Sequence, residues 1–445
     1  EPNPLALIEL SMFDYPLQNH SLDNNFNQLD NHSYLVFDET GCREIEYYTY
    51  KPFIENSGSL SWQQTYEQTP VIFNNIMDTI TANLHKLNSA LTSGFDSRTV
   101  LSNLYHQDVD TKYYSWGKPG SFEIEIPKRI SRKLGLDYRS ILFEKKFIDD
   151  YSFYADQTAY WTDGTGNAKR TNVMYSHSQL TSFSRNMMTG YFGSEILRPV
   201  AANTTILRPA LVKLFFSKYP EKVVEELYQR EVKKGFFTTE WLQKHKEEVI
   251  DNSLTFYKKS FIYDKRHRDL YHFMLKDTLR KFFGQEYHSC RIHSCMHTPY
   301  FDDEFVEFIA QTPIPDLEED GMDSKSCNLR LGQLFYTPIL EKNLPQLMKM
   351  ITGRLYSPAA VKSPLYPLTV LPGYGLYRFK NKFSKYFPSM NVFSATLWNK
   401  NLYKAHSEVF EDSREFLSPV NWKEQQGYSE LGKHFAMRRW LSDKI

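Results

Sequence analysis

Between residues 87 and 190 the sequence alternates short apolar runs with longer amphipathic segments, and this alternation limits the possible folds more than any other feature. Strands that alternate with helices of this length form βαβ units with parallel strands. Open parallel sheets bind their ligands at the carboxyl ends of the strands, near the point where the strand order reverses. We therefore expect an α/β fold with a doubly wound parallel sheet. The predicted strands are 87–92, 111–116, 138–144 and 185–190, and the predicted helices are 97–105, 123–136 and 148–161.

The segments on either side of this alternation show other patterns. Residues 1–66 are typical of short strands, with a hairpin around Gly41, and predict a small β-rich N-terminal region. From Thr69 the apolar residues recur at helical spacing, and Pro70 stands near the expected start of that helix. After residue 207 the pattern is mainly helical. The predicted domains are 1–66 and 67–445, the second divided into an α/β part (67–210) and a mainly helical part (211–445).

The composition argues against several classes of protein. Lys and Arg together number 53, as do Asp and Glu, so the charge balance does not indicate nucleic acid or an anionic membrane as a partner. No apolar run approaches the roughly 18 to 20 residues that cross a bilayer, and the first residues do not resemble a signal peptide. Four cysteines in 445 residues are not a disulfide framework. We expect a cytoplasmic protein with neither membrane nor nucleic-acid partner.

The turn after the first predicted strand reads Thr92-Ser93-Gly94-Phe95-Asp96-Ser97 and has the chemistry of a phosphate site. A tight turn followed by a helix start presents free backbone N–H groups and the positive end of the helix dipole. Hydroxyl groups add donors, and Gly94 allows close approach of the backbone. Asp96 would repel phosphate unless a cation lies between them, which favours Mg²⁺. The alternative is a simple helix cap at Asp96 or Ser97.

Four blocks of sequence resemble, in order, the synthetase domain of asparagine synthetases and their β-lactam synthetase relatives, which belong to the PP-loop ATP pyrophosphatase superfamily. The turn itself resembles the PP-loop, S-G-G-x-D-S. "YSWGKPGSFEIEIPKRISRKLGL" resembles the second strand and a helix opened by an acid, here Glu123. "TGYFGSEILRP" resembles S-G-E-G-S-D-E, and "HTPYFDDEFVEF" resembles R-x-P-F-L-D. The blocks span about residues 70–315, and their order is more specific than any one of them.

The resemblance implies a reaction and a set of residues. Members of the family cleave ATP between the α- and β-phosphates, form an acyl-adenylate and pass the acyl group to an amine. By position, Asp96 and Glu195 would hold Mg²⁺. The nucleotide would contact the PP-loop and the neighbouring strand ends, which are Thr92, Ser93, Gly94, Phe95, Asp96, Ser97, Ser115, Trp116, Gly117, Thr189 and Gly190.

Several positions depart from the family pattern. Tyr191 stands where asparagine synthetases have a glutamate thought to act as the base for ammonia, and Ser194 replaces an aspartate. Arg98 has no counterpart and is predicted either to reach a phosphate or substrate carboxylate or to face solvent. The family's late catalytic lysine is assigned to Lys362, with Arg354 as the alternative. The predicted catalytic residues are Asp96, Arg98, Tyr191, Glu195 and Lys362.

We expect an AMP-forming amide ligase that uses ATP and Mg²⁺ and acts on a small-molecule or peptide carboxylate. Residues 1–66 resemble at most the end of a glutaminase-type domain. The donor would therefore be an amine on the substrate, or ammonia from a missing N-terminal part or from a separate glutaminase subunit. Two alternatives are a nucleotide-binding or regulatory subunit that has lost catalysis and a PP-loop enzyme that modifies a nucleobase or tRNA. Neither a basic excess nor cysteines near the loop support the second alternative.

Two other stretches have more than one interpretation. "HSCRIHSCMH" offers Cys290, His293, Cys295 and His297 as zinc ligands, but buried packing is favoured, because structural zinc sites combine two separated ligand pairs. The glycine-rich stretch 161–167 fits either a mobile lid or an ordinary turn.

Overall fold

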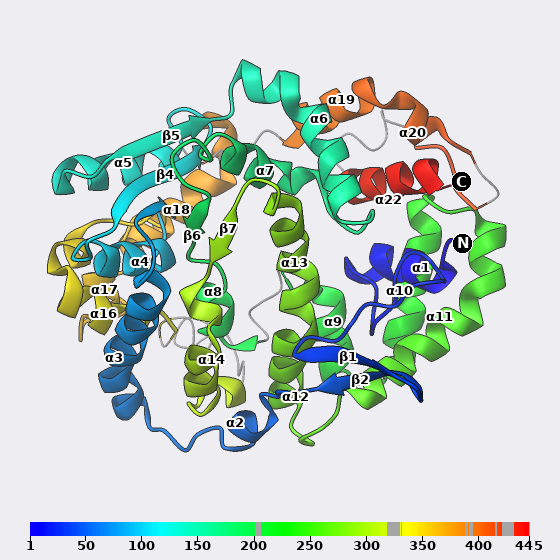
Figure 1. Cartoon of the computed structure of the whole chain (residues 1–445), viewed down its shortest axis with the longest axis horizontal. Helices are drawn as coiled ribbons and strands as arrows, with labels where there is room; N and C mark the ends of the chain where they lie inside the picture. Colours follow the sequence, from blue (N-terminus) through cyan, green and yellow to red (C-terminus); the bar gives the residue numbers. More distant parts are fainter. Residues whose placement is uncertain are drawn as a thin grey trace.

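The computed structural model of the chain describes residues 1–200, 206–317, 330, 332–387, 390, 395–413, 416–420 and 431–444. A five-stranded parallel sheet, in the order β5-β4-β3-β6-β7, lies in one half of the molecule with helices on both faces (Figure 1). The order reverses at β3, so the predicted doubly wound α/β fold is confirmed. The strands are β3 (Lys86–Ala90), β4 (Asp110–Gly117), β5 (Tyr138–Leu142), β6 (Asn186–Met188) and β7 (Cys295–His297).

The helices between these strands follow the predicted pattern closely. α5 shows why, because its first turn carries Glu123 and Glu125, its last turn carries basic residues, and Gly135 ends it in the left-handed conformation. Such local features fix both ends of a helix whatever it packs against. The helices of this part are α4 (Asp96–Leu104), α5 (Phe122–Leu134), α6 (Lys145–Trp161), α7 (Thr171–Ser178) and α8 (Gly193–Ile196).

The predicted start of the helix before the sheet, near Thr69, was wrong. α3 (Trp62–Thr81) begins seven residues before Thr69 and contains Pro70 in its interior. Ser61 caps it, because its hydroxyl accepts from the backbone N–H of Gln64 while the Gln64 side chain accepts from the N–H of Ser61. This capping box decides where the helix begins, and the proline is accommodated within it.

The N-terminal region contains the predicted hairpin and a helix that the sequence pattern did not predict. β1 (Ser33–Asp38) and β2 (Gly41–Glu46) pair antiparallel, and Gly41 takes a positive φ in the turn. α1 (Pro4–Phe13) is buried from Ala6 onward and packs against helices of the second half. A helix that is buried on every side has no polar face, so periodicity cannot reveal it. The proposed boundary at residue 66 stays a prediction.

The second half of the molecule is helical, and both chain ends lie on it (Figure 1). No described helix is both long and apolar enough to cross a membrane. The fifth strand, β7, returns from this half to the sheet. The remaining described α-helices lie in both halves, with α16, α17 and α18 on the side of the sheet (Figure 1). They are α2 (Lys51–Glu55), α9 (Arg208–Phe216), α10 (Pro220–Lys234), α11 (Thr239–Lys259), α12 (Arg266–Phe273), α13 (Leu279–Cys290), α14 (Asp303–Ala310), α16 (Tyr336–Asn343), α17 (Pro358–Lys362), α18 (Leu371–Lys382), α19 (Ala395–Ala405), α20 (Ser407–Glu411) and α22 (Leu431–Lys444).

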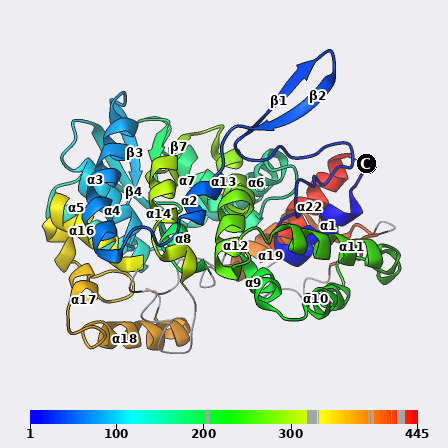
Figure 2. The ribbon, with the colours of Figure 1, turned by 90° about the horizontal axis from the view of Figure 1, so that it is seen from below.

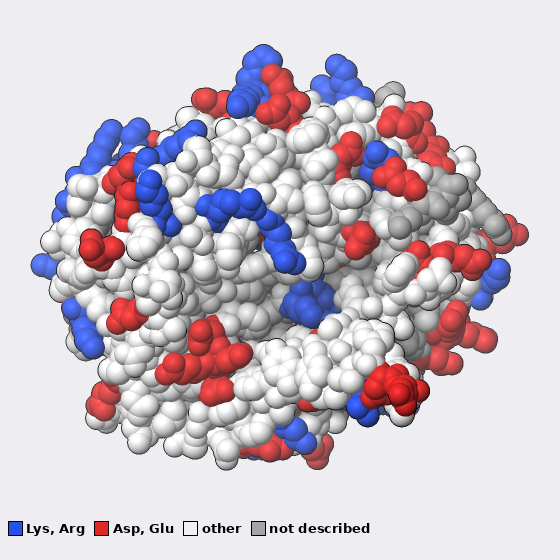
Figure 3. Space-filling view, viewed as in Figure 1, with Lys and Arg blue, Asp and Glu red and all other residues white. Residues whose placement is uncertain are grey.

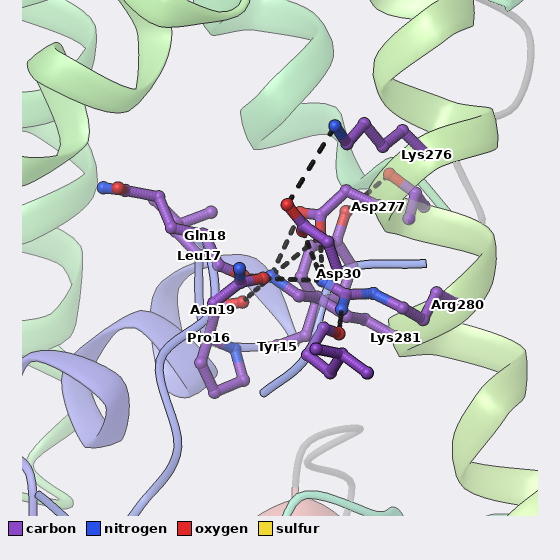
Figure 4. A network of polar contacts seen from close by, with 12 residues as sticks. Tyr15, Pro16, Leu17, Gln18, Asn19, Asp30, Lys276, Asp277, Arg280 and Lys281 are labelled. Carbon is purple, nitrogen blue, oxygen red and sulfur yellow. Dashed lines mark hydrogen bonds and ion pairs between the residues drawn. The ribbon is translucent and has the colours of Figure 1, made fainter. Parts of the chain in front are cut away.

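A buried lysine fastens the N-terminal segment to α13 (Figure 4). The ammonium group of Lys281 donates to the carbonyl oxygens of Pro16 and Gln18 and lies 3.0 Å from the Asp277 carboxylate. Burial lowers the pKa of Lys281, and the charge of Asp277 opposes that shift. The neighbouring Arg280 also pairs with Asp277 and donates to the carbonyl oxygen of Leu29. The ammonium group of Lys281 is therefore satisfied by the protein itself.

Candidate functional site

A cavity of about 290 Å³ lies at the carboxyl edge of the sheet, around the turn that follows β3. The turn after β6 and two later segments complete its wall. This is the position at which doubly wound sheets bind ligands. Among the residues that line it are Thr92, Ser93, Gly94, Phe95, Asp96, Glu123, Ser194, Arg198, Tyr336, Gly353, Arg354 and Tyr377.

The turn after β3 is held in shape by its own hydroxyl groups. The hydroxyl of Ser97 accepts from the backbone N–H of Thr92 at 2.8 Å and lies 2.9 Å from the Thr92 hydroxyl. The N–H of Gly94 in turn donates to the Thr92 hydroxyl at 3.2 Å. The simple capping alternative does not agree with the structure, because α4 has Phe95 at its N-cap and no side-chain cap, and the Ser97 hydroxyl bonds back to Thr92.

Glu123 occupies the donors of Ser93. Its two carboxylate oxygens accept from the Ser93 backbone N–H at 3.0 Å and from the Ser93 hydroxyl at 2.6 Å. A carboxylate thus lies where the turn offers donors to an anion. The sequence marks Glu123 only as the acid that opens α5, and it does not predict this contact across 30 residues.

Asp96 is surrounded by oxygen atoms from distant parts of the chain. Tyr336 donates to one carboxylate oxygen, and Ser194 donates to the other at 3.0 Å. The Tyr300 hydroxyl donates to the Asp96 carbonyl oxygen at 3.1 Å. Burial raises the pKa of Asp96, and the Tyr336 hydrogen bond opposes the shift. The charge of Arg198 also acts to lower the pKa of Asp96. The hydroxyl oxygens around the carboxylate fit a hard cation such as Mg²⁺.

Glu195 lies close enough to Asp96 to sense its charge. The pKa of Glu195 is raised to about 7, mainly by burial and in part by the negative charge of Asp96. Asp96 thus disfavours the charged form of Glu195, an effect that a bound cation would relieve. The described residues hold no group of three or more His, Cys, Asp or Glu side chains placed to bind a metal, so phosphate and water would supply the remaining ligands of Mg²⁺.

Two glycines let the turn after β6 approach Asp96. A Cβ atom on Gly193 would lie 2.5 Å from a carboxylate oxygen of Asp96, and one on Gly190 would lie 2.9 Å from the Asp96 Cβ. Both distances are below what any side chain tolerates. The two turns, about 100 residues apart in sequence, are therefore in direct contact because these positions lack side chains.

Neither predicted role of Arg98 agrees with the structure. Arg98 is fully buried, so it does not face solvent, and it does not line the cavity. Its guanidinium group donates to the carbonyl oxygens of Met350 at 2.7 Å, Ile351 at 2.6 Å and Ser93 at 3.3 Å. Burial lowers its pKa to about 10. Arg98 thus joins the turn to the segment that carries Arg354, which is a positioning role.

The structure places Lys362, the late cation predicted from the sequence, outside the wall of the cavity. Lys362 is 54% exposed and pairs with Glu341. Arg354, the alternative, lines the cavity beside Gly353, whose backbone N–H donates to the Ser93 carbonyl oxygen at 3.1 Å. The two segments touch closely, because a Cβ on Gly353 would lie 2.3 Å from the Ser93 hydroxyl.

The residues predicted to flank adenosine lie at neighbouring strand ends, outside the wall of the cavity. Ser115, Trp116 and Gly117 end β4, while Thr189 and Gly190 follow β6. Because β3 lies between these strands and all three are parallel, their carboxyl ends share one edge. This edge adjoins the turn after β3, but the contacts with a nucleotide stay a prediction.

Tyr191 belongs to a network that includes α13. Its hydroxyl donates to the Glu286 carboxylate at 2.8 Å, and Arg170 pairs with the same carboxylate. Burial raises the pKa of Tyr191 to about 12, with the charge of Arg170 acting in the opposite direction. Glu286 is 95 residues away in sequence and has no motif around it, so only the structure finds this partner.

A second cavity, of about 490 Å³, lies between the N-terminal segment, the end of α6, α13 and α22. Figure 3 shows a hollow over α13, in the middle of the face, with Lys or Arg side chains in it. The stretch 161–167 borders this cavity and not the first one. Its Gly164 packs against Trp440 so closely that a Cβ would lie 2.6 Å from that side chain. Such packing favours the interpretation as an ordinary turn.

The zinc alternative for the Cys- and His-containing stretch is not supported by the described residues. Cys290 is buried at the end of α13, and burial raises the pKa of its thiol to about 12, which is unfavourable for a metal-binding thiolate. Cys295 is exposed, and His297 contacts the Asn186 side chain at 3.2 Å. Cys295 and His297 instead belong to β7, a strand that the sequence pattern did not predict.

The doubly wound sheet, with its serine-rich turn and aspartate at the carboxyl edge, defines a PP-loop protein of the ATP-using class. A family profile described as asparagine synthase matches residues 82–324, which is more than half of the chain. The chain belongs to the asparagine synthase family, whose members use ATP as ligases or amidotransferases. No individually curated protein matches the sequence.

Proposed function

We propose that this protein is an AMP-forming amide ligase, which adenylates a substrate carboxylate, releases pyrophosphate and passes the acyl group to an amine or ammonia. One observation carries the proposal. The first cavity gathers the serine-rich turn, Asp96 and Arg354 in a single space at the carboxyl edge of the sheet. Backbone donors, a carboxylate for a cation and a guanidinium are the groups that a leaving pyrophosphate needs.

In the first step an oxygen of the substrate carboxylate attacks the α-phosphorus of ATP. The bond from that phosphorus to the bridging oxygen breaks, and pyrophosphate leaves with both electrons. The donors of Ser93, Gly94 and Phe95 are proposed to hold the pyrophosphate once the Gly94 N–H leaves the Thr92 hydroxyl, with Arg354 offsetting its charge. Mg²⁺ held by Asp96 and Glu195 would neutralise phosphate charge.

For the pyrophosphate to use the Ser93 donors, Glu123 must first release them. A pyrophosphate group carries more negative charge than the Glu123 carboxylate, and its oxygens can accept the same charge-assisted hydrogen bonds from Ser93. We therefore infer that the Glu123 side chain turns away, or shares a cation with the phosphates, when nucleotide binds. Glu123→Gln, which removes the charge, is expected to tighten nucleotide binding where release of the Ser93 donors by Glu123 is the main cost of binding.

In the second step the amine nitrogen attacks the acyl carbon, and AMP leaves. A proton must leave the nitrogen. The Tyr191 hydroxyl and its partner Glu286, with Arg170 fixing the carboxylate, are proposed to receive it. A tyrosine in place of the family's acid supports an amine over free ammonia as the acceptor, although a separate glutaminase subunit stays among the proposed partners.

The test is pyrophosphate release from ATP, measured with panels of carboxylates and amines and with Mg²⁺ present. We expect release that depends on a carboxylate, and AMP release that depends on both substrates. ATP binding without pyrophosphate release in any mixture would instead support the nucleotide-binding subunit that has lost catalysis. Release that depends on tRNA and on no small carboxylate would support the nucleobase-modifying alternative.

A further inference from the structure

One stretch of this electrically balanced chain is strongly basic. Residues 342–407 contain no Asp or Glu, whereas the whole chain has 53 acids and 53 bases. Within it, α18 carries Arg378, Lys380 and Lys382 and contributes to the wall of the first cavity. The cations of the whole stretch are Lys342, Lys349, Arg354, Lys362, Arg378, Lys380, Lys382, Lys385, Lys400 and Lys404.

The same stretch exposes large apolar side chains. α18 buries none of its side chains, and the 22 residues from 365 to 386, here called the α18 flap, hold a large share of the exposed apolar groups of the described chain. Leu368 and Tyr386 are the most open, at 70% and 71%. Contiguous exposed apolar surface of this kind marks an interaction site. The exposed apolar residues of the flap are Leu365, Leu368, Leu371, Leu376, Phe379, Phe383 and Tyr386.

The two faces of α18 have different surroundings. Tyr377 and Asn381, four residues apart, line the first cavity. Leu376, Phe379 and Phe383 recur at three- and four-residue spacing and are exposed, so they form a separate stripe. Figure 2 shows α18 at the outer edge of the molecule, far from the β1–β2 hairpin. The stripe is therefore a projecting surface beside the catalytic cavity.

We propose that this stripe and the cations around it dock onto a membrane surface that contains anionic lipid. A helix that carries Leu and Phe beside Lys and Arg lies in the lipid interface, with its apolar side chains among the acyl chains and its cations at the headgroups. A projecting stripe suits a broad, soft surface better than it suits an extended acidic peptide, which needs a groove. Docking on the surface requires neither a spanning helix nor an overall positive charge, so it revises the expectation that no membrane partner exists.

The experiment is flotation of the full-length chain with vesicles. Vesicles of phosphatidylcholine with phosphatidylglycerol are compared with vesicles of phosphatidylcholine alone. We expect the protein to float with the anionic vesicles and to be released as salt rises, because salt screens charges at the surface. Equal flotation with both kinds of vesicle, or none with either, would overturn the proposal.

Matched variants locate the contact. Reversing two exposed cations in Arg378→Glu/Lys382→Glu is expected to weaken binding more than about tenfold, given roughly fivefold for each cation near such a surface. Lys222→Glu/Lys233→Glu on α10 makes the same change in net charge and should bind like the parent. Leu376→Ser/Phe379→Ser should also weaken binding about tenfold or more, unlike Phe37→Ser on the hairpin, where the side chain is 74% exposed.

Two further outcomes would contradict the lipid assignment. The first is binding of a polyglutamate peptide to a chain that does not bind anionic vesicles. If Arg378→Glu/Lys382→Glu abolishes that peptide binding, the occupant of the flap is an acidic peptide. If the chain self-associates in the absence of vesicles and Leu376→Ser/Phe379→Ser abolishes that association, the stripe is an interface between copies. Circular dichroism of every variant shows whether the fold is kept, which is expected because all the substituted side chains are exposed.

Discussion

Asp96 and Lys281 are both charged groups in the interior, beside the first and the second cavity, yet their surroundings differ. Lys281 has two carbonyl oxygens and the Asp277 carboxylate around its ammonium group. The hydrogen bonds to the Asp96 carboxylate come from neutral hydroxyl groups of Tyr336 and Ser194. The protein thus places a carboxylate directly beside Lys281, whereas Asp96 has neutral hydrogen-bond donors and senses the charge of Arg198, so a cation bound with the ligand would add a direct partner. The first arrangement stabilises the fold, and the second is suited to function.

Removing the Asp96 carboxylate should have the largest effect on turnover. Even partners that only support a metal ligand change metal affinity by about 10- to 100-fold, so Asp96→Ala is expected to lower Mg²⁺-dependent pyrophosphate release by at least about 100-fold. Titration of Mg-ATP binding checks whether the loss lies in binding. Unchanged binding in a folded Asp96→Ala protein would refute the assignment of the turn as a PP-loop.

The next largest effect on turnover should separate Arg354 from Lys362. A cation that offsets charge on the leaving pyrophosphate should act like other charge-stabilising donors, which contribute about 10²- to 10³-fold to kcat. Arg354→Ala is therefore expected to slow pyrophosphate release by about 100-fold. Lys362→Ala serves as the control and should leave the rate unchanged, since its side chain is exposed and pairs with Glu341. A larger loss of rate in Lys362→Ala than in Arg354→Ala would instead support Lys362 as the late catalytic lysine predicted from the sequence.

A single methyl group can test the contact between the two turns. Gly193→Ala places a Cβ within 2.5 Å of the Asp96 carboxylate, so either the turn or the carboxylate must move. A displacement of about 1 Å near reacting groups costs on the order of 100-fold in rate at most, and we expect a loss of tenfold or more. Gly284→Ala, in the interior of α13 with open space around it, should keep the parent rate and melt at the parent temperature or slightly above it, because alanine favours the helix.

The smallest effect on turnover is expected at Lys281. Lys281→Met leaves two carbonyl oxygens without their buried donor and Asp277 with Arg280 as its remaining cation. Leaving a buried acceptor unsatisfied costs about 1–3 kcal/mol, so we expect the unfolding free energy to fall by about that amount or more. Urea denaturation measures this loss. The pyrophosphate release rate per folded molecule should stay at the parent value. A variant that keeps its stability but loses turnover would mean that the second cavity, and not only the first, takes part in the reaction.

Features built from neighbouring residues could be predicted from the sequence. The β1–β2 hairpin, the alternation from β3 to β6 and the turn at residues 92–97 all depend on local propensity and on hydrogen bonds that span a few residues. The family resemblance, which the profile match confirms, rests on the same local blocks. The helix start at Trp62 was missed because a capping box outweighed the position of Pro70.

The sequence by itself therefore determined the class of fold, the family and the turn around Asp96. Only the tertiary structure decided that α1 is a buried helix, that Arg98 holds the segment around Ile351, and that Arg354 and not Lys362 lines the cavity. It also brought Glu286 to Tyr191. For the polar groups among these, the physical reason is the same. A buried polar group takes whatever partner the packing brings within hydrogen-bonding distance, and those partners lie from 95 to more than 250 residues away along the chain.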